Sequence, residues 1–179
     1  MAYDLDKAIR KVKDFPKEGI LFFDITSILT NPEAFSWCTD RLCSLIKTRK
    51  IDAIAAVEAR GFLFSAPAAE KCGIPLILVR KKGKLPGKKL SRSFQLEYGE
   101  DTIQVHVDDV PKGGNVLIVD DLVATGGTLK AAAELLSEAG AMVKDIFCVV
   151  GLPFLPYKEV LKDYNITTLI DYDSEKSEE

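Results

Sequence analysis

The sequence contains a single histidine, His106, and only four cysteines among its 179 residues. The cysteines form no CxxC pair, so their spacing gives no indication of a zinc or redox site. One histidine excludes a metal cage built from several imidazoles, and no nucleophile elbow is present to indicate a Ser-His-Asp triad. We therefore expect His106 to be an ordinary strand residue. We expect the cysteines to be small buried side chains: Cys38, Cys43, Cys72 and Cys148.

The sequence also lacks an apolar run long enough to span a membrane. Residues 1–13 alternate charged with apolar side chains and have no apolar centre like that of a signal peptide, so a cytoplasmic location is expected. With 24 basic and 27 acidic residues, the formal net charge is -3. This balance gives no general reason to expect nucleic acid or an anionic membrane as a partner. A hydrophobic content of 47% is typical of one globular domain of this length.

Apolar runs alternate with helical patterns along most of the chain. Asn31-Pro32-Glu33 is typical of a helix start, with an N-cap, a proline in the first turn and an acidic side chain. Helices between buried strands predict an α/β fold with a mostly parallel twisted sheet and helices on both faces. In such sheets ligands bind at the carboxyl ends of strands. The predicted strands are 51–57, 74–79, 116–119 and 142–150, and further helices are predicted at 62–71 and 128–139.

The middle of the chain departs from this alternation. Residues 91–97 and 102–107 are β-like and are separated by the turn-forming sequence Tyr98-Gly99-Glu100-Asp101. This spacing predicts an antiparallel hairpin, or a mobile flap, inserted into the α/β core.

The most informative stretch is VLIVDDLVATGGT at residues 116–128. A buried strand is followed by two carboxylates, and a small glycine-rich turn then enters a helix, bringing backbone N–H groups, hydroxyls and a helix N-terminus together as an anion site. The stretch lacks the lysine of a P-loop and is not GxGxxG, so neither a nucleoside triphosphate nor a dinucleotide is indicated. One phosphate beside an acidic pair suits a sugar phosphate. The bland alternative is a glycine pair that only caps a helix.

This stretch is similar to the signature of type I phosphoribosyltransferases. Four further motifs follow the order found in adenine phosphoribosyltransferases: DFPKEGILFFDIT at 14–26, VEARGFLF at 57–64, RKKGKLPG at 80–87 and LEYG at 96–99. The phosphate signature alone indicates the superfamily, whereas ARGF, GKLPG and LEYG resemble the adenine family. The resemblance implies transfer of phosphoribose from phosphoribosyl pyrophosphate to adenine, giving AMP and pyrophosphate in purine salvage. It also implies substrate-associated Mg²⁺ and a homodimer.

The resemblance further implies one phosphoribosyltransferase domain over residues 1–179. Within it, residues 1–30 would form a base-binding hood and residues 90–107 the flap, while the polar residues 171–179 would form a flexible tail. Asp120 and Asp121 would hold the ribose hydroxyls and favour the oxocarbenium-like state. Glu97 would handle the purine proton beside Tyr98 on the flap, although EYG on its own is only an ordinary turn. The 5′-phosphate would bind Ala124, Thr125, Gly126, Gly127 and Thr128.

Pyrophosphate would bind the loop after the first buried strand and the basic run at 80–89, which would otherwise be a solvated loop. The resemblance places a non-proline cis peptide at the Ala59–Arg60 bond, and gives Lys84 a possible role in the neighbouring subunit. Lys88 and Lys89 are left to solvent. The pyrophosphate-binding residues implied are Ala59, Arg60, Arg80, Lys81 and Lys84.

Adenine would be held between apolar groups of the hood and read through backbone atoms. The implied set is Leu21, Phe22, Phe23 and Arg60, with core packing as the alternative for these apolar side chains and for Phe22 in particular. Phe23 stands where the family commonly has a charged residue, often arginine. Backbone recognition would survive that change.

Three rival interpretations remain at this point. Another phosphoribosyltransferase, acting on a 6-oxopurine, xanthine or orotate, would share the phosphate signature. A non-catalytic regulator could keep the fold to sense phosphoribosyl pyrophosphate or a nucleotide. The least specific alternative is a sugar-phosphate-binding α/β domain.

Overall fold

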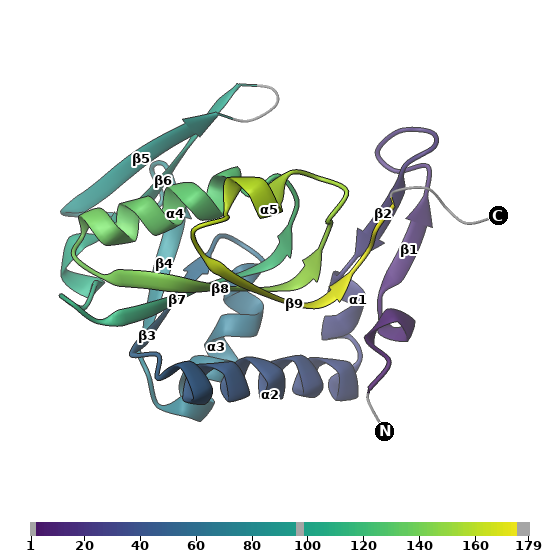
Figure 1. The fold of residues 1–179 in the computed structure, drawn as a ribbon, viewed down its shortest axis with the longest axis horizontal. Helices are drawn as coiled ribbons and strands as arrows, with labels where there is room; N and C mark the ends of the chain where they lie inside the picture. The colour runs from purple at the N-terminus through teal and green to yellow at the C-terminus, as the bar shows by residue number, and fades with distance from the viewer. Residues whose placement is uncertain (1–2, 96–98, 175–179) are drawn as a thin grey trace.

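The computed structural model describes residues 3–95 and 99–174, and in them seven strands form one sheet in the order β5-β6-β4-β3-β7-β8-β9 (Figure 1). The pairs from β4 to β9 are parallel, and only β6 and β5 are antiparallel additions. The mostly parallel α/β sheet expected from the alternating pattern is therefore confirmed. The strands are β3 (Ala53–Val57), β4 (Leu76–Lys81), β5 (Lys89–Gln95), β6 (Glu100–His106), β7 (Asn115–Val123), β8 (Met142–Gly151) and β9 (Asn165–Asp171).

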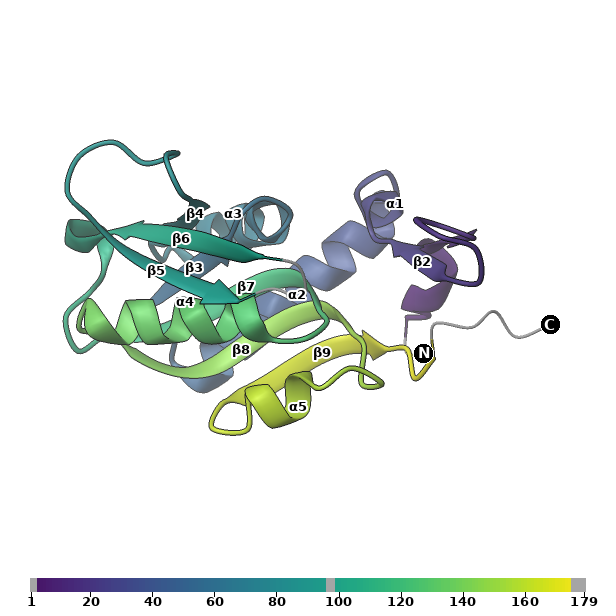
Figure 2. The same ribbon diagram turned by 90° about the horizontal axis from the view of Figure 1, so that it is seen from above.

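Helices cover both faces of this sheet (Figures 1 and 2). α2 (Pro32–Arg49) and α3 (Gly61–Cys72) pack with the hood on one face, whereas α4 (Gly127–Glu138) packs on the other. β3 is buried along its whole length, since each face of the sheet faces a helix layer. The short elements are α1 (Thr26–Leu29), α5 (Tyr157–Val160), η1 (Leu5–Ala8) and η2 (Val107–Asp109).

The local signals for helix ends act as expected. The Asn31 side chain accepts a hydrogen bond of 3.2 Å from the backbone N–H of Ala34, and Pro32 occupies the first turn of α2. α3 ends at Cys72, and its C-cap Gly73 has a positive φ of 66°, a left-handed conformation that glycine adopts with little strain. No helix of residues 3–95 and 99–174 is long and apolar enough to cross a membrane.

The hood contains a separate two-stranded antiparallel sheet, β1 (Arg10–Lys13) and β2 (Leu21–Asp24). The β1–β2 hairpin and the β5–β6 hairpin project from the same side of the molecule, at its opposite ends (Figures 1 and 2). The two arms therefore flank the central strands. His106 is the last residue of β6, as expected. All four cysteines are free thiols; Cys38, Cys43 and Cys148 are buried as expected, whereas Cys72 is only half-buried.

Two expectations, one about the end of β7 and one about the C-terminal tail, need correction. β7 continues to Val123, so Asp120 and Asp121 lie within the strand rather than after it. The tail does not begin at residue 171, because Asp171 ends β9 and the ring of Tyr172 stacks on that of Phe23 with centroids 3.7 Å apart. The edge strand β9 was not predicted, since its half-buried sequence lacks a continuous apolar run.

Candidate active site

A cavity of about 580 Å³ lies where the central strands end. Parallel strands present their carboxyl ends at one edge, so residues distant in sequence meet there. Both predicted carboxylates and the predicted arginine of the β3–α3 turn line it. The lining residues are Val57, Glu58, Ala59, Arg60, Val79, Lys81, Asp101, Ile103, Asp120, Asp121, Leu122 and Thr128.

A second cavity of about 120 Å³ adjoins the first and is formed by the loop between β7 and α4. Asp120, Leu122 and Thr128 line both cavities, so the two form a continuous site. Gly126 has a φ of 85°, a conformation that glycine adopts without strain and that turns the chain into α4. The first turn of α4 carries no acidic residue, which leaves its N–H groups suited to an anion. All five residues predicted to bind the phosphate line this cavity: Ala124, Thr125, Gly126, Gly127 and Thr128.

The two carboxylates have different surroundings. Asp121 is only 5% exposed, and its Oδ2 lies 2.6 Å from the Nε of Arg60, although this contact lacks hydrogen-bond geometry. Oδ1 of Asp120 accepts a hydrogen bond of 2.8 Å from the backbone N–H of Asp121. Burial, together with the neighbouring Asp121 charge, raises the pKa of Asp120 well above its usual value. The site thus opposes ionisation of both carboxyl groups at once, with one guanidinium beside Asp121.

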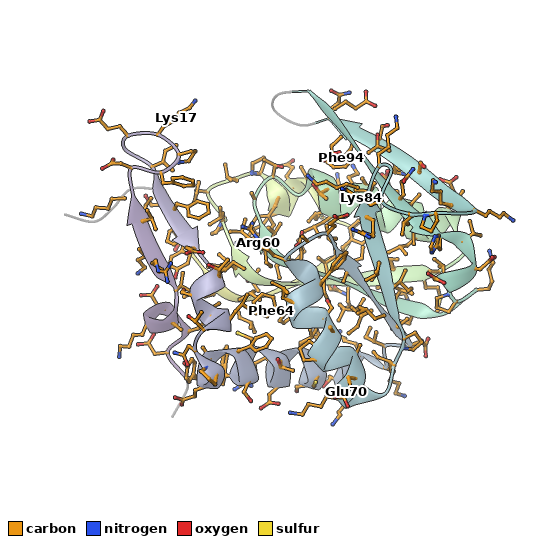
Figure 3. The ribbon with its side chains drawn as sticks, turned by 180° about the vertical axis from the view of Figure 1, so that it is seen from behind. Lys17, Arg60, Phe64, Glu70, Lys84 and Phe94 are labelled. Carbon is orange, nitrogen blue, oxygen red and sulfur yellow. The ribbon has the colours of Figure 1, made fainter. Side chains whose placement is uncertain are left out.

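The turn that carries Arg60 differs from the expectation in one detail. The non-proline cis peptide is the Glu58–Ala59 bond, not Ala59–Arg60, so the predicted position was wrong by one bond. Arg60 already has helical dihedral angles and caps the N-terminal end of α3. In Figure 3 Arg60 lies between the hood, whose tip carries Lys17, and the β5–β6 hairpin, which carries Phe94.

Gly61 allows α3 to approach β7 at the acidic pair. A Cβ at this position would lie 2.7 Å from the carbonyl oxygen of Val119 and 3.1 Å from the Cα of Asp120. Both are backbone atoms, so no flexible side chain can move aside. The glycine therefore fixes the closeness of Arg60 to Asp121.

Gly61→Ala is expected to lower both stability and activity. Overpacking against backbone typically costs about 1–3 kcal/mol of unfolding free energy, and separating α3 from β7 would displace Arg60 from Asp121. Thermal unfolding and turnover check this. Ala66→Leu is a suitable control, because it adds bulk on the exposed side of the same helix. Wild-type values for the Gly61 variant would contradict the close approach.

Glu58 organises the next loop, a role that the sequence analysis missed. Its carboxylate accepts two hydrogen bonds of 3.2 Å from the Arg80 guanidinium and one of 2.8 Å from the backbone N–H of Lys81. The Arg80 hydrogen bonds, the largest influence, lower the pKa of Glu58 below its usual value. The position of Glu58 immediately after β3, at the ligand-binding edge of the sheet, was the sequence signal that could have identified this role. Asp101, also missed, reaches the cavity because β6 pairs with β4.

Only part of the basic run at residues 80–89 lies at the cavity. Lys81 lines it, and its Nζ lies 3.6 Å from Oδ2 of Asp101. Arg80 is not among the lining residues, since its guanidinium faces Glu58 and the carbonyl oxygen of Lys84. The Lys84 side chain is exposed, on the flap side of the site (Figure 3).

The three predicted apolar residues of the hood lie on β2 and do not line either cavity. Phe23 is 6% exposed and stacks on Tyr172, so its side chain belongs to the core, whereas Phe22, for which core packing was the alternative in particular, is half-buried. Alternation along β2 explains this, since Phe22 points to the opposite face, where it meets Phe15. The hood still interacts with the site through the charges of Asp24 and Arg60. The pKa of Asp24 is lowered mainly by the Thr26 hydroxyl, and the nearby charge of Arg60 contributes to the shift.

The predicted proton-handling residue Glu97 and its neighbour Tyr98 lie outside the described residues. The strands beside them are held on α4, because Arg92 of β5 pairs with Glu134 at 3.0 Å and with Glu138 at 2.9 Å. A Cβ added at Gly127 would lie 3.7 Å from the carbonyl oxygen of Gln95, the last residue of β5. The end of β5 next to the turn of the hairpin therefore adjoins the phosphate loop.

Comparisons with known proteins agree with this geometry. Residues 24–175 match a family model described as a phosphoribosyl transferase domain. An adenine phosphoribosyltransferase of Treponema denticola is 60% identical over 172 residues, which cover 96% of this chain and 90% of that protein.

Solved structures give the same result. The adenine phosphoribosyltransferase of Thermoanaerobacter pseudethanolicus superposes with a TM-score of 0.88 at 45% identity, covering 94% of this chain and 98% of that one. The Saccharomyces cerevisiae enzyme, complexed with an imino-altritol bisphosphate and adenine, has a TM-score of 0.86 at 37% identity, covering 92% and 96% of the two chains.

Proposed function

Because this chain belongs to the adenine phosphoribosyltransferase family, we propose that it transfers the 5-phosphoribosyl group of phosphoribosyl pyrophosphate to adenine, giving AMP and pyrophosphate in purine salvage. The observation that carries this function is the continuous site that joins an acidic pair to a helix N-terminus suited to phosphate. A sugar phosphate needs both parts in one site, the acidic pair for its hydroxyls and the helix N-terminus for its phosphate. A regulator without catalysis would not require the buried pair.

In the reaction, the bond from ribose C1 to the pyrophosphate oxygen breaks and its electron pair leaves with pyrophosphate. A ring nitrogen of adenine forms the new bond to C1, and its proton is lost. Positive charge develops on the ribose ring between these events. Asp120 and Asp121 would accept hydrogen bonds from the ribose hydroxyls and stabilise that charge more than the ground state, which is the condition for catalysis.

Arg60 would change partners during the cycle. It contacts Asp121 at 2.6 Å, yet its side chain is 48% exposed, so pyrophosphate can reach the guanidinium. Ribose hydroxyls would then replace Arg60 at Asp121, while the guanidinium binds phosphate oxygens in its forked geometry. Lys81 and the Ala59 backbone would complete the pyrophosphate site. Arg80 would act with them once Glu58 releases it, and Lys84 would belong to the site of a neighbouring subunit.

Mg²⁺ would be bound mainly through pyrophosphate oxygens and water. Among residues 3–95 and 99–174, no three or more His, Cys, Asp or Glu side chains are grouped to hold a metal ion. The ion would neutralise part of the charge on the leaving group. The residues of this chain would position the ribose next to the leaving group.

Glu97→Gln is expected to slow turnover by about 10²–10⁴-fold, the usual contribution of a positioned acid–base group. Glutamine preserves size and hydrogen bonding but cannot exchange a proton. Steady-state kcat with adenine is the measurement, and Glu100→Gln on the same hairpin is the control. A loss well below tenfold would show that Glu97 only covers the site.

The family resemblance also supports a cytoplasmic homodimer, with the RKKGKLPG loop near the subunit contact. This part of the proposal rests on motif similarity, and the molar mass in solution tests it. The described side chains in that loop are mostly exposed, as a contact loop requires.

The proposed activity is tested by supplying phosphoribosyl pyrophosphate and Mg²⁺ with adenine, hypoxanthine, guanine, xanthine or orotate in turn. The expected result is that pyrophosphate is released when adenine is the base supplied and not when any of the other four bases is. Release with another base would select a rival transferase, and binding without release for any base would select the regulator.

A further inference from the structure

The hood has no backbone ladder to the main sheet within the described residues. β1 and β2 pair only with each other, and the seven other strands form the second sheet. Side-chain packing must therefore set where β2 lies relative to the phosphoribose cavity. Apolar side chains of the hood pack on α2 and the sheet, and one further contact comes from the far end of the chain.

Tyr172 is attached to the main sheet through its backbone. It directly follows β9, and its N–H donates a hydrogen bond of 3.0 Å to the carbonyl oxygen of Gly151 at the end of β8. β8 in turn pairs with β7, the strand of the acidic pair. The position of Tyr172 is thus defined by the same sheet that positions the candidate site.

The Tyr172 side chain contacts the hood at two points. Its ring lies on that of Phe23, with centroids 3.7 Å apart and planes 12° apart, and its hydroxyl donates a 2.6 Å hydrogen bond to Oδ1 of Asp6. Lys11 donates to the other oxygen of Asp6 at 2.7 Å and places its ammonium 5.5 Å from the tyrosine ring centroid. These contacts reach η1, β1 and β2, so the Tyr172 side chain joins three elements of the hood to the main sheet.

The hydrogen bond from Tyr172 to Asp6 is expected to persist at neutral pH. Hydrogen bonds from Lys11 and then from Tyr172 lower the pKa of Asp6 below its usual value, so the carboxylate stays ionised. Burial and that hydrogen bond raise the pKa of Tyr172, which keeps its phenol protonated as a donor. Donor and acceptor therefore persist under the conditions in which the protein would act.

Phe23 transmits the contact to the base-reading strand. It sits in β2 between Phe22 and Asp24, whose backbone runs along the segment proposed to read adenine, and Asp24 is close enough to Arg60 for their charges to interact. Movement of the Phe23 ring would shift the backbone of these two neighbours relative to Arg60. Because Phe23 is held by Tyr172, it contributes to the base site by placement, not by touching the base.

We propose that Tyr172 is a positioning residue that holds β2 at the distance from the phosphoribose cavity that adenine requires. This inference rests on the proposed function and extends it to a residue that touches no substrate. Loosening the hood lowers the fraction of molecules competent to bind the base, and apparent affinity falls by that fraction. Affinity for phosphoribosyl pyrophosphate does not depend on β2 and should be preserved.

The test compares Tyr172→Leu, Tyr172→Phe and the control Tyr164→Leu. Tyr164 is also half-buried, but it packs on the opposite core. Tyr172→Leu should raise KM for adenine about tenfold, the largest effect expected from losing an aromatic pair. KM for phosphoribosyl pyrophosphate should change by less than about twofold, since β2 does not touch it. Tyr172→Phe keeps the stack and should restore most of the adenine affinity, and Tyr164→Leu should leave both constants near wild type.

Amide hydrogen exchange of residues 21–24 gives a readout independent of activity. Faster exchange in Tyr172→Leu but not in Tyr164→Leu supports the inference. If Tyr172→Leu fails to fold, Asp6→Ala removes the acceptor shared by the Tyr172 hydroxyl and the Lys11 ammonium but keeps the aromatic stack. It should still raise the adenine KM about threefold, with the same exchange pattern.

An unchanged adenine KM, an equal rise in both KM values, or the same effect from Tyr164→Leu would overturn the inference. Failure of the wild type to form AMP would instead overturn the proposed function. In that case the exchange measurement still decides whether Tyr172 holds the hood, so the two failures are distinguishable.

Discussion

The wild-type protein is expected to prefer adenine to hypoxanthine and guanine by about 10⁴-fold in kcat/KM, within the range that polar recognition achieves. Adenine offers an amino donor at C6 and an acceptor at N1, whereas 6-oxopurines present the reverse. β2 pairs with β1 alone among the described strands, so its outer edge offers backbone C=O and N–H groups. Residues 20–23 can therefore read the purine edge without a charged side chain.

A 6-oxopurine on the same edge would place carbonyl against carbonyl and N–H against N–H. Each mispaired buried group costs about 1–3 kcal/mol, so two of them account for most of the discrimination. The burial of Phe23 does not weaken this argument, because backbone atoms make the contacts. If hypoxanthine or guanine matched adenine within tenfold, β2 would not be the base reader, although phosphoribosyl transfer itself could still hold.

Asp120→Asn and Asp121→Asn are each expected to reduce kcat/KM by about 10²–10³-fold, the typical loss when one group that stabilises transition-state charge is removed. Both carboxylates line the cavity and neither fills the apolar core. Melting temperature should therefore stay within about 4 °C of wild type, which corresponds to roughly 1 kcal/mol for a chain of this size.

Asp120→Asn should not destabilise the fold at neutral pH. The folded-state pKa of Asp120 is raised, so its stabilising contribution is present below the unfolded pKa of about 4 and is lost as pH rises through the folded value. Asparagine removes the penalty of burying that charge. Stability of this variant should consequently decline less between acid and neutral pH than stability of the wild type.

Asp145→Asn is the matched control for the acidic pair. Asp145 is as buried as Asp121, at 5% exposure, and its Oδ1 lies 3.4 Å from the Nε of Arg49, but it lines neither cavity. This variant should lose stability and keep its turnover. Marked destabilisation with near-normal turnover in the Asp120 or Asp121 variant would show that the pair is structural.

Local chemistry made the central fold predictable. Continuous apolar runs identified β3 and β8, and Asn31, Pro32 and Gly73 marked helix ends whose caps the structure contains. The order of strands and helices then placed the residues after β3 and along β7 at one edge. For this reason Arg60, Asp120 and Asp121 could be predicted to converge before any coordinates were known.

Contacts between distant segments were not predictable in this way. The stacking of Phe23 on Tyr172 joins opposite ends of the chain, and neither residue lies in a pattern that indicates the other. The Glu58–Arg80 pair likewise depends on β3 and β4 lying side by side, which composition and periodicity do not reveal. Sequence therefore located the candidate site, whereas the partners that hold its parts in place required the structure.

The most direct measurement follows AMP and pyrophosphate together after adenine, phosphoribosyl pyrophosphate and Mg²⁺ are mixed with the wild-type protein. The proposed function predicts that the two products appear in equal amounts, and that Asp121→Asn in the same assay forms them at least about a hundredfold more slowly. Pyrophosphate release without AMP, or equal rates for the two proteins, would contradict the account.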